Sequence, residues 1–565
     1  MLLSNMELLA TAPGGVAKLR ELILTLAVQG KLVPQDPADE PAGVLLQKIR
    51  AEKDRLIAQG KIKRDKPLAE IAEEEKPFGL PQGWEWVRLA ALAEFENGDR
   101  GSNYPSRSNF VEHGVAFINA GHLVDERIDY SDMNYITPQN FALLRSGKVQ
   151  RDDILYCLRG SLGKFAQVTE NSPGAIASSL VIIRLSVAAV APYAMQYLKS
   201  PLAASLIKRF DNGTAQPNLG AGDLAKFVVP LPPEAEQSRI VTRVEELMRL
   251  CDALEAKGQL EAAQHAQLVS TLLGTLTAST TPEELAANWQ RVAQHFDLLL
   301  DRPEAIDALE QTLLQLAVRG LLVPQDPTDE PASALLQKIR AEKDRLIATG
   351  QIKRDKPLPP ITDEEKPFEL PVGWEWVRVG DVVELLNGYA FKSEWFKPAG
   401  VRLLRNVNIS HGHVDWSVPV MLDAIAAKSY EQFALRAGDI VLSLDRPIIS
   451  TGLKYAVIRD SDLPCLLLQR VARLTACACL SSEFLQLWLK SDLFVGTIDP
   501  GRSNGVPHIS TKQVAGLAFA LPPLAEQSRI VTRVTALRRL CADLRQRLAE
   551  RQSVQARLAE ALLIH

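Results

Sequence analysis

Two stretches of the chain repeat apolar residues at helical spacing over an unusual length. The first runs from Glu234 to about Thr275, directly after Pro232-Pro233, and its apolar positions are Ile240, Val244, Leu247, Cys251, Leu254, Leu268 and Leu272. The second runs from Leu524 to the C-terminus, with apolar residues at Ile530, Val534, Leu537, Leu544 and Leu548. The pattern predicts two helices of about 40 residues, or ~60 Å at 1.5 Å per residue, unless Gly258 interrupts the first. Because long apolar stripes need cover, we expect the two helices to pair with each other.

A shorter amphipathic helix is predicted twice. The letters LLQKIRAEKDRLIA occupy residues 45–58 and recur without change at residues 335–348. Each copy follows the letters DEP, which places Pro41 or Pro331 in the first turn, and each is followed by a glycine two residues after its last alanine. Proline near the start and glycine just past the end are the usual boundaries of a helix.

These recurrences belong to one internal repeat with a fixed offset of 290 residues. Residues 28–89 align with residues 318–379, and 48 of the 62 positions are identical. Residues 230–254 align with residues 520–544 at the same offset, where LPP and AEQSRIVTRV recur. Repeats of this kind decide the architecture before any local feature does. The chain therefore reads as two units joined by a short connector, each with a near-constant arm on either side of a variable centre.

The two centres, residues 90–229 and 380–519, have equal length but share few residues in register. Short apolar segments between Gly, Asn and Pro loops predict strands at DILYCL (153–158), LVIIRL (180–185) and DIVLSL (439–444). Helical patterns lie at 192–210 and 481–495. Each centre is long enough to bury its own core, so we expect two mixed α/β domains of similar fold with different surfaces.

Composition and charge set limits on function. A chain of 565 residues suggests about three or four structural units. No stretch reaches the ~18 apolar residues of a membrane helix, and the N-terminal letters MLLSNMELLATAPGG lack the basic start of a signal peptide. Six cysteines form no disulfide framework, so we expect a cytoplasmic protein with no membrane partner. The net charge of −4 gives no global signature of nucleic-acid binding, which must then rest on local features.

The order of the motifs resembles one protein family. GWEWVR opens each variable centre, a long helix beginning LPP-x-AEQSRIV follows it, and VPQDP-x-DEP and EEKPF-x-LP-x-GWEW complete each arm. In this respect the chain is similar to the specificity subunits of type I restriction-modification systems, over essentially its whole length and twice over. The resemblance implies a non-catalytic subunit that recognises a bipartite asymmetric site in double-stranded DNA. It also implies two adenine methyltransferase (modification) subunits as partners and, through them, motor-nuclease (restriction) subunits, with no cofactor held by this chain.

The fold class implied is α+β, with two α/β target-recognition domains separated by paired long antiparallel helices in an internal two-fold pseudo-repeat. The expected segments are a helical arm at 1–82, a first target-recognition domain at 83–232, a central helix and connector at 233–290, a second arm at 291–372, a second target-recognition domain at 373–522 and a C-terminal helix at 523–565. Equal arms suit two copies of one partner, and unequal centres suit two unlike half-sites. A duplicated scaffold that binds two copies of a protein without reading DNA remains the alternative.

Polar loops in the two centres supply candidates for DNA contact. Base edges are read by Arg, Asn or Gln, whereas phosphates are held by Lys, Arg, hydroxyls or backbone amides. The first centre offers Arg100, Asn103, Tyr104, Arg107, Arg159, Ser161, Lys164, Thr214, Gln216 and Asn218. The second centre offers Lys392, Arg405, Asn406, Arg446, Arg502, Asn504 and His508. Most polar loop residues are simply solvated. We therefore expect only a few of these candidates in each centre to contact DNA.

Acidic and basic residues nearly balance within each centre. We therefore expect the isolated chain to bind DNA weakly, and tight binding to need the methyltransferase partners around the duplex. The half-sites and the spacer length do not follow from the sequence, because they depend on loop geometry and DNA shape as well as on residue type. Nor does the sequence reveal whether a functional nuclease subunit accompanies the chain.

Motifs of catalytic chemistry are missing from the sequence. It has neither the D/N-P-P-Y/F motif of adenine methyltransferases nor a G-x-x-x-x-G-K-[ST] phosphate loop. The E-x-K triplets at residues 74–76 and 364–366 lie in a charged linker and read as solvated charges. Cys477-Ala-Cys479 and His411-Gly-His413 lack the two further ligands of a structural zinc site. We therefore expect no catalytic or metal site, and we expect Trp84-Glu-Trp86 to pack at a domain edge rather than to stack on bases.

Overall fold

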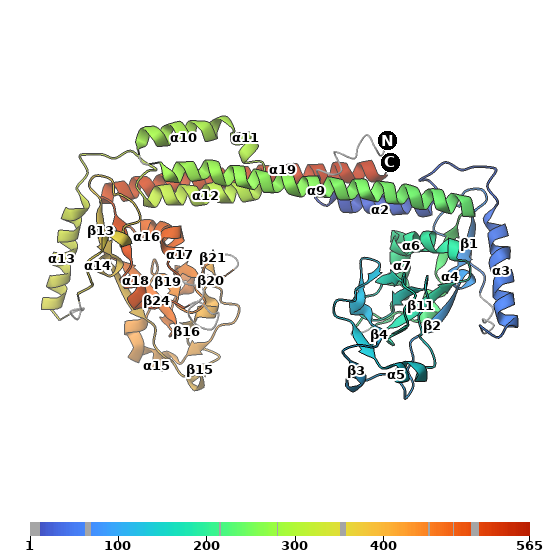
Figure 1. Ribbon diagram of the computed structural model, residues 1–565. Helices are drawn as coiled ribbons and strands as arrows, with labels where there is room; N and C mark the ends of the chain where they lie inside the picture. The colour runs from blue at the N-terminus through green and yellow to red at the C-terminus, as the bar shows by residue number, and fades with distance from the viewer. Residues whose placement is uncertain are drawn as a thin grey trace. The chain divides into compact units, whose positions relative to one another are not determined.

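The computed structural model describes residues 12–62, 69–213, 216–279, 281–350, 357–449, 452–477, 480–498 and 508–564. The chain folds into two compact units: unit 1 is Met1–Leu260 with Gln552–His565, and unit 2 is Glu261–Arg551. Each unit contains one centre of the repeat and most of the two arms that flank it, together with the end of the other copy's long helix (Figure 1). The boundary between the units falls inside two long helices, α9 (Glu234–Ala278) and α19 (Leu524–Ile564).

Both long helices form where the apolar pattern predicts them. α9 continues through Gly258, because the cost of one glycine in a helix, about 1 kcal/mol, is small beside the packing of its apolar stripe. In unit 1, buried residues near the start of α9 share a core with Ala559 near the end of α19. In unit 2, Val269 and Leu273 near the end of α9 share a core with Cys541 of α19. The start of α9 thus packs with the end of α19 in unit 1, and the end of α9 packs with the first half of α19 in unit 2, which is the order of the antiparallel pair that the sequence predicts.

Unit 1 begins with α2 (Gly15–Val28), which lies along α9 (Figure 1) and buries Leu19 and Ile23. The predicted LLQKIRAEKDRLIA helix is α3 (Ala42–Ala58). Pro41 caps this helix from outside rather than lying in its first turn, because its ψ of 151° is extended. After the helix, Gly60 has a φ of 68°, the left-handed conformation that ends many helices and that glycine adopts without strain.

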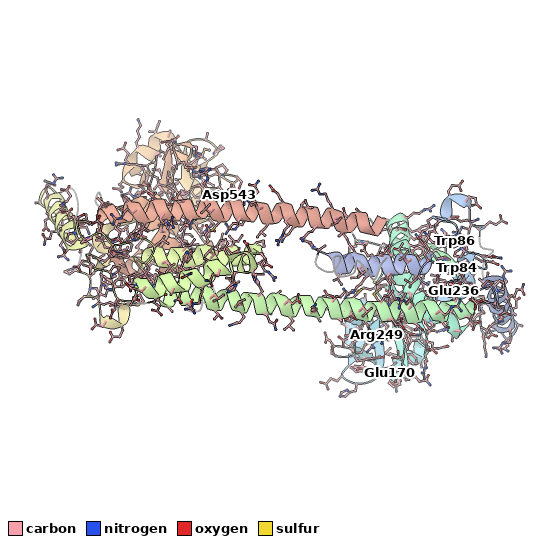
Figure 2. The ribbon with its side chains drawn as sticks, turned by 90° about the horizontal axis from the view of Figure 1, so that it is seen from above. Trp84, Trp86, Glu170, Glu236, Arg249 and Asp543 are labelled. Atoms are coloured by element: carbon pink, nitrogen blue, oxygen red, sulfur yellow. The ribbon has the colours of Figure 1, made fainter. Side chains whose placement is uncertain are left out.

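A two-stranded ribbon joins the arm of unit 1 to its centre. β1 (Glu85–Arg88) pairs antiparallel with β12 (Val228–Leu231). The indole of Trp84, just before β1, is buried and donates a hydrogen bond of 2.9 Å to Glu236 in the first turn of α9. Figure 2 labels both residues at the same end of α9. The ring of Trp86 lies 5.0 Å from that of Phe78. Both tryptophans therefore pack within the arm, as the sequence predicts.

The centre of unit 1 holds two four-stranded sheets, with strand orders β10-β4-β7-β3 and β2-β11-β8-β9. Their strands are β2 (Ala93–Asn97), β3 (Phe110–Val111), β4 (Val115–Ile118), β7 (Asn134–Ile136), β8 (Ile154–Cys157), β9 (Phe165–Gln167), β10 (Gly174–Ile176) and β11 (Leu180–Leu185). The stretch 192–210, predicted as one helical pattern, forms α6 (Ala191–Lys199) and α7 (Pro201–Phe210). The chain breaks there because Pro201 cannot continue the hydrogen bonds of α6, and Ser200 caps α7.

Unit 2 repeats this plan with α12 (Pro303–Val318), α13 (Ala332–Ala348) and a ribbon of β13 (Glu375–Arg378) with β25 (Ala518–Leu521). Its centre holds sheets of order β14-β24-β19-β22-β17 and β15-β18-β16-β23. Their strands are β14 (Val383–Asn387), β15 (Phe396–Lys397), β16 (Val401–Leu404), β17 (His411–Gly412), β18 (Met421–Leu422), β19 (Ile440–Ser443), β22 (Tyr455–Val457), β23 (Cys465–Leu467) and β24 (Val471–Ala476). The helical pattern at 481–495 is again two helices, α16 (Ser482–Lys490) and α17 (Asp492–Val495).

Shorter elements complete the two units. They are α4 (Leu89–Leu92), α5 (Pro138–Leu143), α8 (Ala221–Leu224), α14 (Val379–Val382), α15 (Ala424–Ala427), α18 (Thr511–Ala515), and the ribbons β5 (Leu123–Val124) with β6 (Arg127–Ile128) and β20 (Ile448–Ile449) with β21 (Gly452–Leu453). α10 (Pro282–Gln294) and α11 (Phe296–Leu299) connect the two copies. The predicted α+β class, with two mixed α/β centres separated by a long helix, is confirmed. In the part of the chain that the structure describes, none of the helices has the length and apolar character needed to cross a membrane.

Candidate nucleic-acid interface

In unit 1, three loops of the centre are held together by backbone hydrogen bonds. The chain after β8 receives the loop before α8: Gly160 N donates to Pro217 O at 3.0 Å, and Arg159 and Asn218 form a bridge. On its other side, Leu158 N donates to Ser179 O at 2.8 Å. We call the surface formed by residues 158–164, 177–179 and 216–218 the first loop edge.

Five of the predicted DNA-contacting residues lie on the first loop edge: Arg159, Ser161, Lys164, Gln216 and Asn218. The first four are exposed, whereas Asn218 is half-buried and its amide donates to Asn212 Oδ1 at 2.7 Å. Thr214 lies outside the described residues. The structure thus brings two sequence-distant loops to one place and leaves two cationic side chains free to point outward there.

The remaining candidates of unit 1 come from the loop after β2. Arg100 donates to Ser178 O at 3.4 Å, which places this loop beside the first loop edge. The hydroxyl of Tyr104 accepts from Ser178 N at 3.4 Å, and its ring lies 5.7 Å from that of Phe117. Asn103 donates to a backbone carbonyl at 3.1 Å, while Arg107 is exposed. In this geometry Tyr104 and Asn103 hold the loop, and Arg100 and Arg107 are the side chains that can reach a ligand.

In unit 2 the equivalent edge is organised around one carboxylate. Asp445, just after β19, contacts Arg470 Nη1 and His508 Nδ1, each at 2.8 Å. The backbones agree: Leu444 N donates to Arg470 O at 2.9 Å, and Asp445 bridges with His508. We call residues 444–447, 468–470 and 508–509 the second loop edge.

The second loop edge gathers basic groups. Arg446 is exposed and has a φ of 47°, a left-handed conformation that is strained for arginine. Lys454 N donates to Pro447 O, and burial lowers the pKa of the Lys454 ammonium while Asp445 counteracts that shift. Arg470 and His508 therefore contact Asp445 directly, Arg446 follows it in the chain, and Lys454 lies beside the edge within reach of its charge. A local positive cluster exists here that the balanced charge of the whole centre conceals.

Arg470 and Lys454 were not among the sequence candidates. Arg470 lies in the short connection between β23 and β24, has a φ of 74°, and exposes two thirds of its side chain. A polar Gln-Arg pair between the apolar runs LPCLLL and VARLTA was the available signal. A tight turn of two polar residues lacks the long polar run that marks the other loops of this centre.

The other candidates of unit 2 make contacts elsewhere in the centre or lie outside the described residues. The Arg405 guanidinium donates to Val418 O at 2.6 Å, within its own loop, and Asn406 begins the short turn that follows. Lys392 lies over the Trp395 ring at 5.7 Å. Arg502 and Asn504 lie outside the described residues.

The residues considered for zinc or nuclease chemistry have other contacts in the structure or lie outside the described residues. His411 lies on β17 with its ring against Tyr455, and Cys479 lies outside the described residues. Glu74 and Lys76 belong to a short 3-10 turn and its end, with Lys76 paired to Glu73 at 2.6 Å. Searching the residues that the structure describes yields no cluster of three His, Cys, Asp or Glu side chains able to hold a metal ion.

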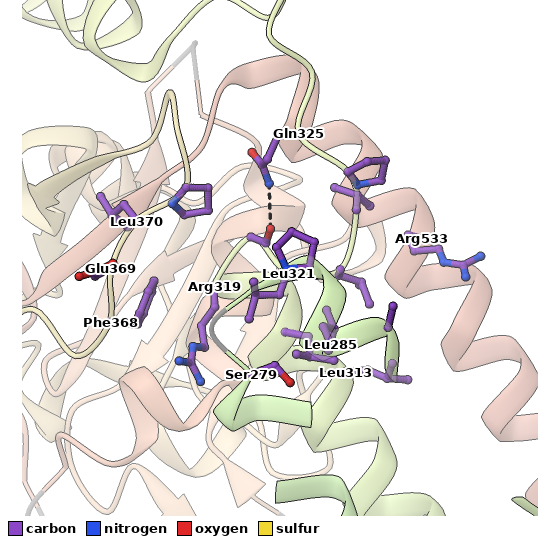
Figure 3. Close-up of a pocket in the computed structure, with 18 of the residues that line it drawn as sticks. Ser279, Leu285, Leu313, Arg319, Leu321, Gln325, Phe368, Glu369, Leu370 and Arg533 are labelled. Carbon is purple, nitrogen blue, oxygen red and sulfur yellow. Dashed lines mark hydrogen bonds between the residues drawn. The ribbon is translucent and has the colours of Figure 1, made fainter. Parts of the chain in front are cut away.

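A pocket of 710 Å³ lies in unit 2, between α10, α12, α19 and the loops of the arm (Figure 3). Its lining is mostly apolar and includes Leu313, Leu321 and Phe368. The Arg319 guanidinium donates to Thr277 O and lies 5.2 Å from the centre of the Phe368 ring. All of its lining residues fall in the constant arm and connector rather than in the centre, so this pocket belongs to the framework and not to the loop edge.

Comparison with known proteins follows the same division into two copies. A family model described as the type I restriction modification DNA specificity domain matches residues 81–264 and 371–551. The type I restriction enzyme EcoAI specificity subunit of Escherichia coli is 47% identical over 562 residues, which cover 97% of this chain and 93% of that protein. The EcoEI specificity subunit of Escherichia coli is 34% identical over 572 residues, with 97% and 93% covered.

Among solved structures, the HsdS subunit from Thermoanaerobacter tengcongensis matches with a TM-score of 0.41 and 18% identity, over 86% of this chain and 97% of that chain. The assignment rests on the sequence matches, which span both arms and both centres. The chain belongs to the family of type I restriction-modification DNA specificity subunits.

Proposed function

We infer that the chain is the DNA sequence-specificity subunit of a type I restriction-modification enzyme and carries out no chemistry itself. The observation that carries this inference is the pair of family matches, one on each arm and centre, in a chain whose arms agree and whose centres differ. Two unlike readers in one chain suit a bipartite, asymmetric site. We propose residues 83–232 and 373–522 as the two target-recognition domains and the cytoplasm as their location.

The first and second loop edges are the proposed reading surfaces. Each combines exposed cationic side chains with a backbone fixed by cross-loop hydrogen bonds. A rigid backbone holds side chains in the geometry that base reading requires, whereas the cations attract the phosphates. Because the positive groups are few, the isolated chain should bind DNA weakly until partners close around the duplex. The long helices would set the distance between the half-sites.

The proposed partners are two adenine methyltransferase subunits, with motor-nuclease subunits joining through them. Large apolar side chains stand exposed at equivalent positions of the long helices: Leu250 and Leu540 are 45% and 58% exposed, and Leu268 and Leu558 are 51% and 48% exposed. Unit 1 contains Leu250 and Leu558, and unit 2 contains Leu540 and Leu268. Each unit therefore offers the same pair, as two copies of one partner would require.

A centre replacement tests the function. In the full chain, residues 90–229 are replaced by the matching centre of the EcoAI relative, the chain is expressed with its own methyltransferase, and methylated adenines are located by sequencing the DNA. One half of the methylated sequence should change while the other half stays. Loss of methyltransferase binding without any change of sequence would instead support the scaffold that never reads DNA.

A further inference from the structure

The short helix of each unit contacts its long helix through an ion pair at the same place, but the charges are inverted. In unit 1, Arg20 of α2 contacts Glu255 of α9, with Nη2 and Oε2 2.7 Å apart. In unit 2, Glu310 of α12 contacts Arg545 of α19, with Oε2 and Nη2 2.5 Å apart. Position 310 is the repeat equivalent of position 20, and 545 is that of 255, at the offset of 290 residues. The ion pair therefore lies at the same place in both units, but the positive and negative residues have exchanged helices.

Neighbouring charges extend the inversion. Arg20 also contacts Asp252 at 2.7 Å, and position 542, the equivalent of 252, is an alanine. In unit 2, Arg545 also contacts Asp307 at 2.6 Å, and Arg538 contacts Glu310 at 3.2 Å. Their equivalents are Ala17 and Met248, which carry no charge. Unit 1 thus sets one cation on the short helix against two acids, whereas unit 2 sets two acids on the short helix against two cations.

Two buried positions next to these charges are alike in the two helix pairs. Leu19 and its equivalent Leu309 are both buried, and so are Cys251 and Cys541 on the long helices. The loops that follow the short helices keep the same sequence LVPQDP in both arms. Apolar contact at these two positions therefore favours neither pairing. Exchange of a structural element between two copies of a chain is a low-cost route to dimers.

The charges favour α2 on α9 and α12 on α19 over the crossed pairings. With α2 on α19, Arg20 would face Arg538 and Arg545. With α12 on α9, Asp307 and Glu310 would face Asp252 and Glu255. We propose that this inverted ion pair assigns each short helix to the long helix of its own half, and so disfavours the crossed pairings, α2 on α19 or α12 on α9, both within one chain and between two copies of it. The side chains are partly exposed, so their effect lies mainly in the difference between attractive and repulsive pairings.

Exchange of the charges between the halves tests the proposal in the full-length chain. The short-helix variant interchanges the residues of α2 and α12 only, by A17D, R20E, D307A and E310R. The complete variant adds the long-helix equivalents, by M248R, D252A, E255R, R538M, A542D and R545E. The short-helix variant keeps the apolar residues beneath the charges, whereas the complete variant replaces one of them, because Met248 packs against the core of unit 1. Wild-type and variant chains, each as a mixture of unlabelled and ¹⁵N-labelled protein, are partly unfolded in mild denaturant, returned to buffer and weighed by native mass spectrometry.

The short-helix variant should form mixed dimers and larger species at least about fivefold more than wild type, the ratio that one exposed charge pair of ~1 kcal/mol can produce. The complete variant should return to the wild-type distribution, because each half again holds complementary charges. The milder variant R20A/E310A, which removes charge without reversing it, should fall between them. The proposal is overturned if the short-helix and R20A/E310A variants remain as monomeric as wild type, or if the complete variant associates as much as the short-helix variant.

Discussion

The duplicated arms and the two loop edges lie in the same repeat, but the repeat preserves different things in each. In the arms it preserves side-chain contacts: Trp84 donates to Glu236 and Trp374 to Glu526, both at 2.9 Å. In the loop edges it preserves the crossing of two backbones while the side chains change. Repeated side-chain contacts give both arms the same structure. A repeated backbone with different side chains suits two domains that recognise different DNA sequences.

Other arm contacts recur in the same way. Arg88 pairs with Glu75 in unit 1 and Arg378 with Glu365 in unit 2. The loop edges, in contrast, bridge Arg159 with Asn218 in one unit and Asp445 with His508 in the other. The contrast predicts that equivalent substitutions in the two arms should have equal effects, whereas a substitution in one loop edge should affect recognition by that centre alone.

The largest expected effect comes from the buried arm tryptophans. The variants W84A and W374A should each destabilise the chain by about 3–5 kcal/mol, because each leaves a cavity and an acid without its indole donor. Denaturant unfolding of the full chain measures both. Because the two sites repeat one geometry, the two losses should agree within about 1 kcal/mol; clearly unequal losses would show that the arms are not equivalent.

Partner docking offers a second way to test the equality of the arms. The variants L250D/L558D and L540D/L268D each place charge on the exposed leucines of one unit. Each variant should weaken one of two methyltransferase sites by at least about tenfold, because charged groups in an apolar contact lose its energy. Titration calorimetry with the purified partner measures this. A variant that loses both sites, or neither, contradicts two equivalent docking surfaces.

A narrower effect is expected from Asp445, which tethers Arg470 and His508. The variant D445A should release both side chains and lower methylation of target sites by about tenfold, the effect of one or two lost base or phosphate contacts. The matched control is R402A, whose guanidinium bonds to loop carbonyls of the same domain rather than lying at the edge. Substitutions in the other edge, such as R159A, should leave recognition of the half-site read through Asp445 unchanged when single-base variants of the site are compared.

The smallest effect concerns acid stability of the arms. The Arg88 and Arg378 guanidiniums lower the pKa of Glu75 and Glu365 from 4.5 to about 2. Because the folded-state pKa is the lower one, this stabilisation is present above about pH 4.5 and is lost as the pH falls toward 2. The variant E75Q/E365Q should therefore unfold with a flatter pH dependence between pH 5 and 2. E74Q, at an exposed neighbouring position, is the control that should keep the wild-type slope.

The framework could be predicted from the sequence because it follows from periodicity and repetition. Apolar spacing, proline and glycine predict the positions of four helices, α9, α19, α3 and α13. The offset of 290 residues also predicts that each contact in one arm has an equivalent in the other. Breaks within helical patterns are harder to predict from sequence. The pattern at 192–210 is helical throughout, and only Ser200-Pro201 divides it into two helices. A helix boundary marked by one or two residues is easily missed when the apolar residues on both sides keep helical spacing.

The loop edges could be predicted only in part, because they depend on which loops cross. The polar runs around Arg159 and Asn218 were visible, but nothing in the sequence says that they bridge. Arg470 was missed since it occupies a tight turn whose position at the edge results from the pairing of β24 with β19. Contacts between residues far apart in sequence are set by sheet topology rather than by local pattern.

The most direct test of the whole interpretation is the native mass of the full chain, purified with its partners from the host at moderate salt. Two copies of an adenine methyltransferase on each chain would agree with duplicated arms that dock one partner twice. A complex with a single methyltransferase would contradict the equivalence of the arms. A complex with other proteins and no methyltransferase would contradict the specificity-subunit function itself.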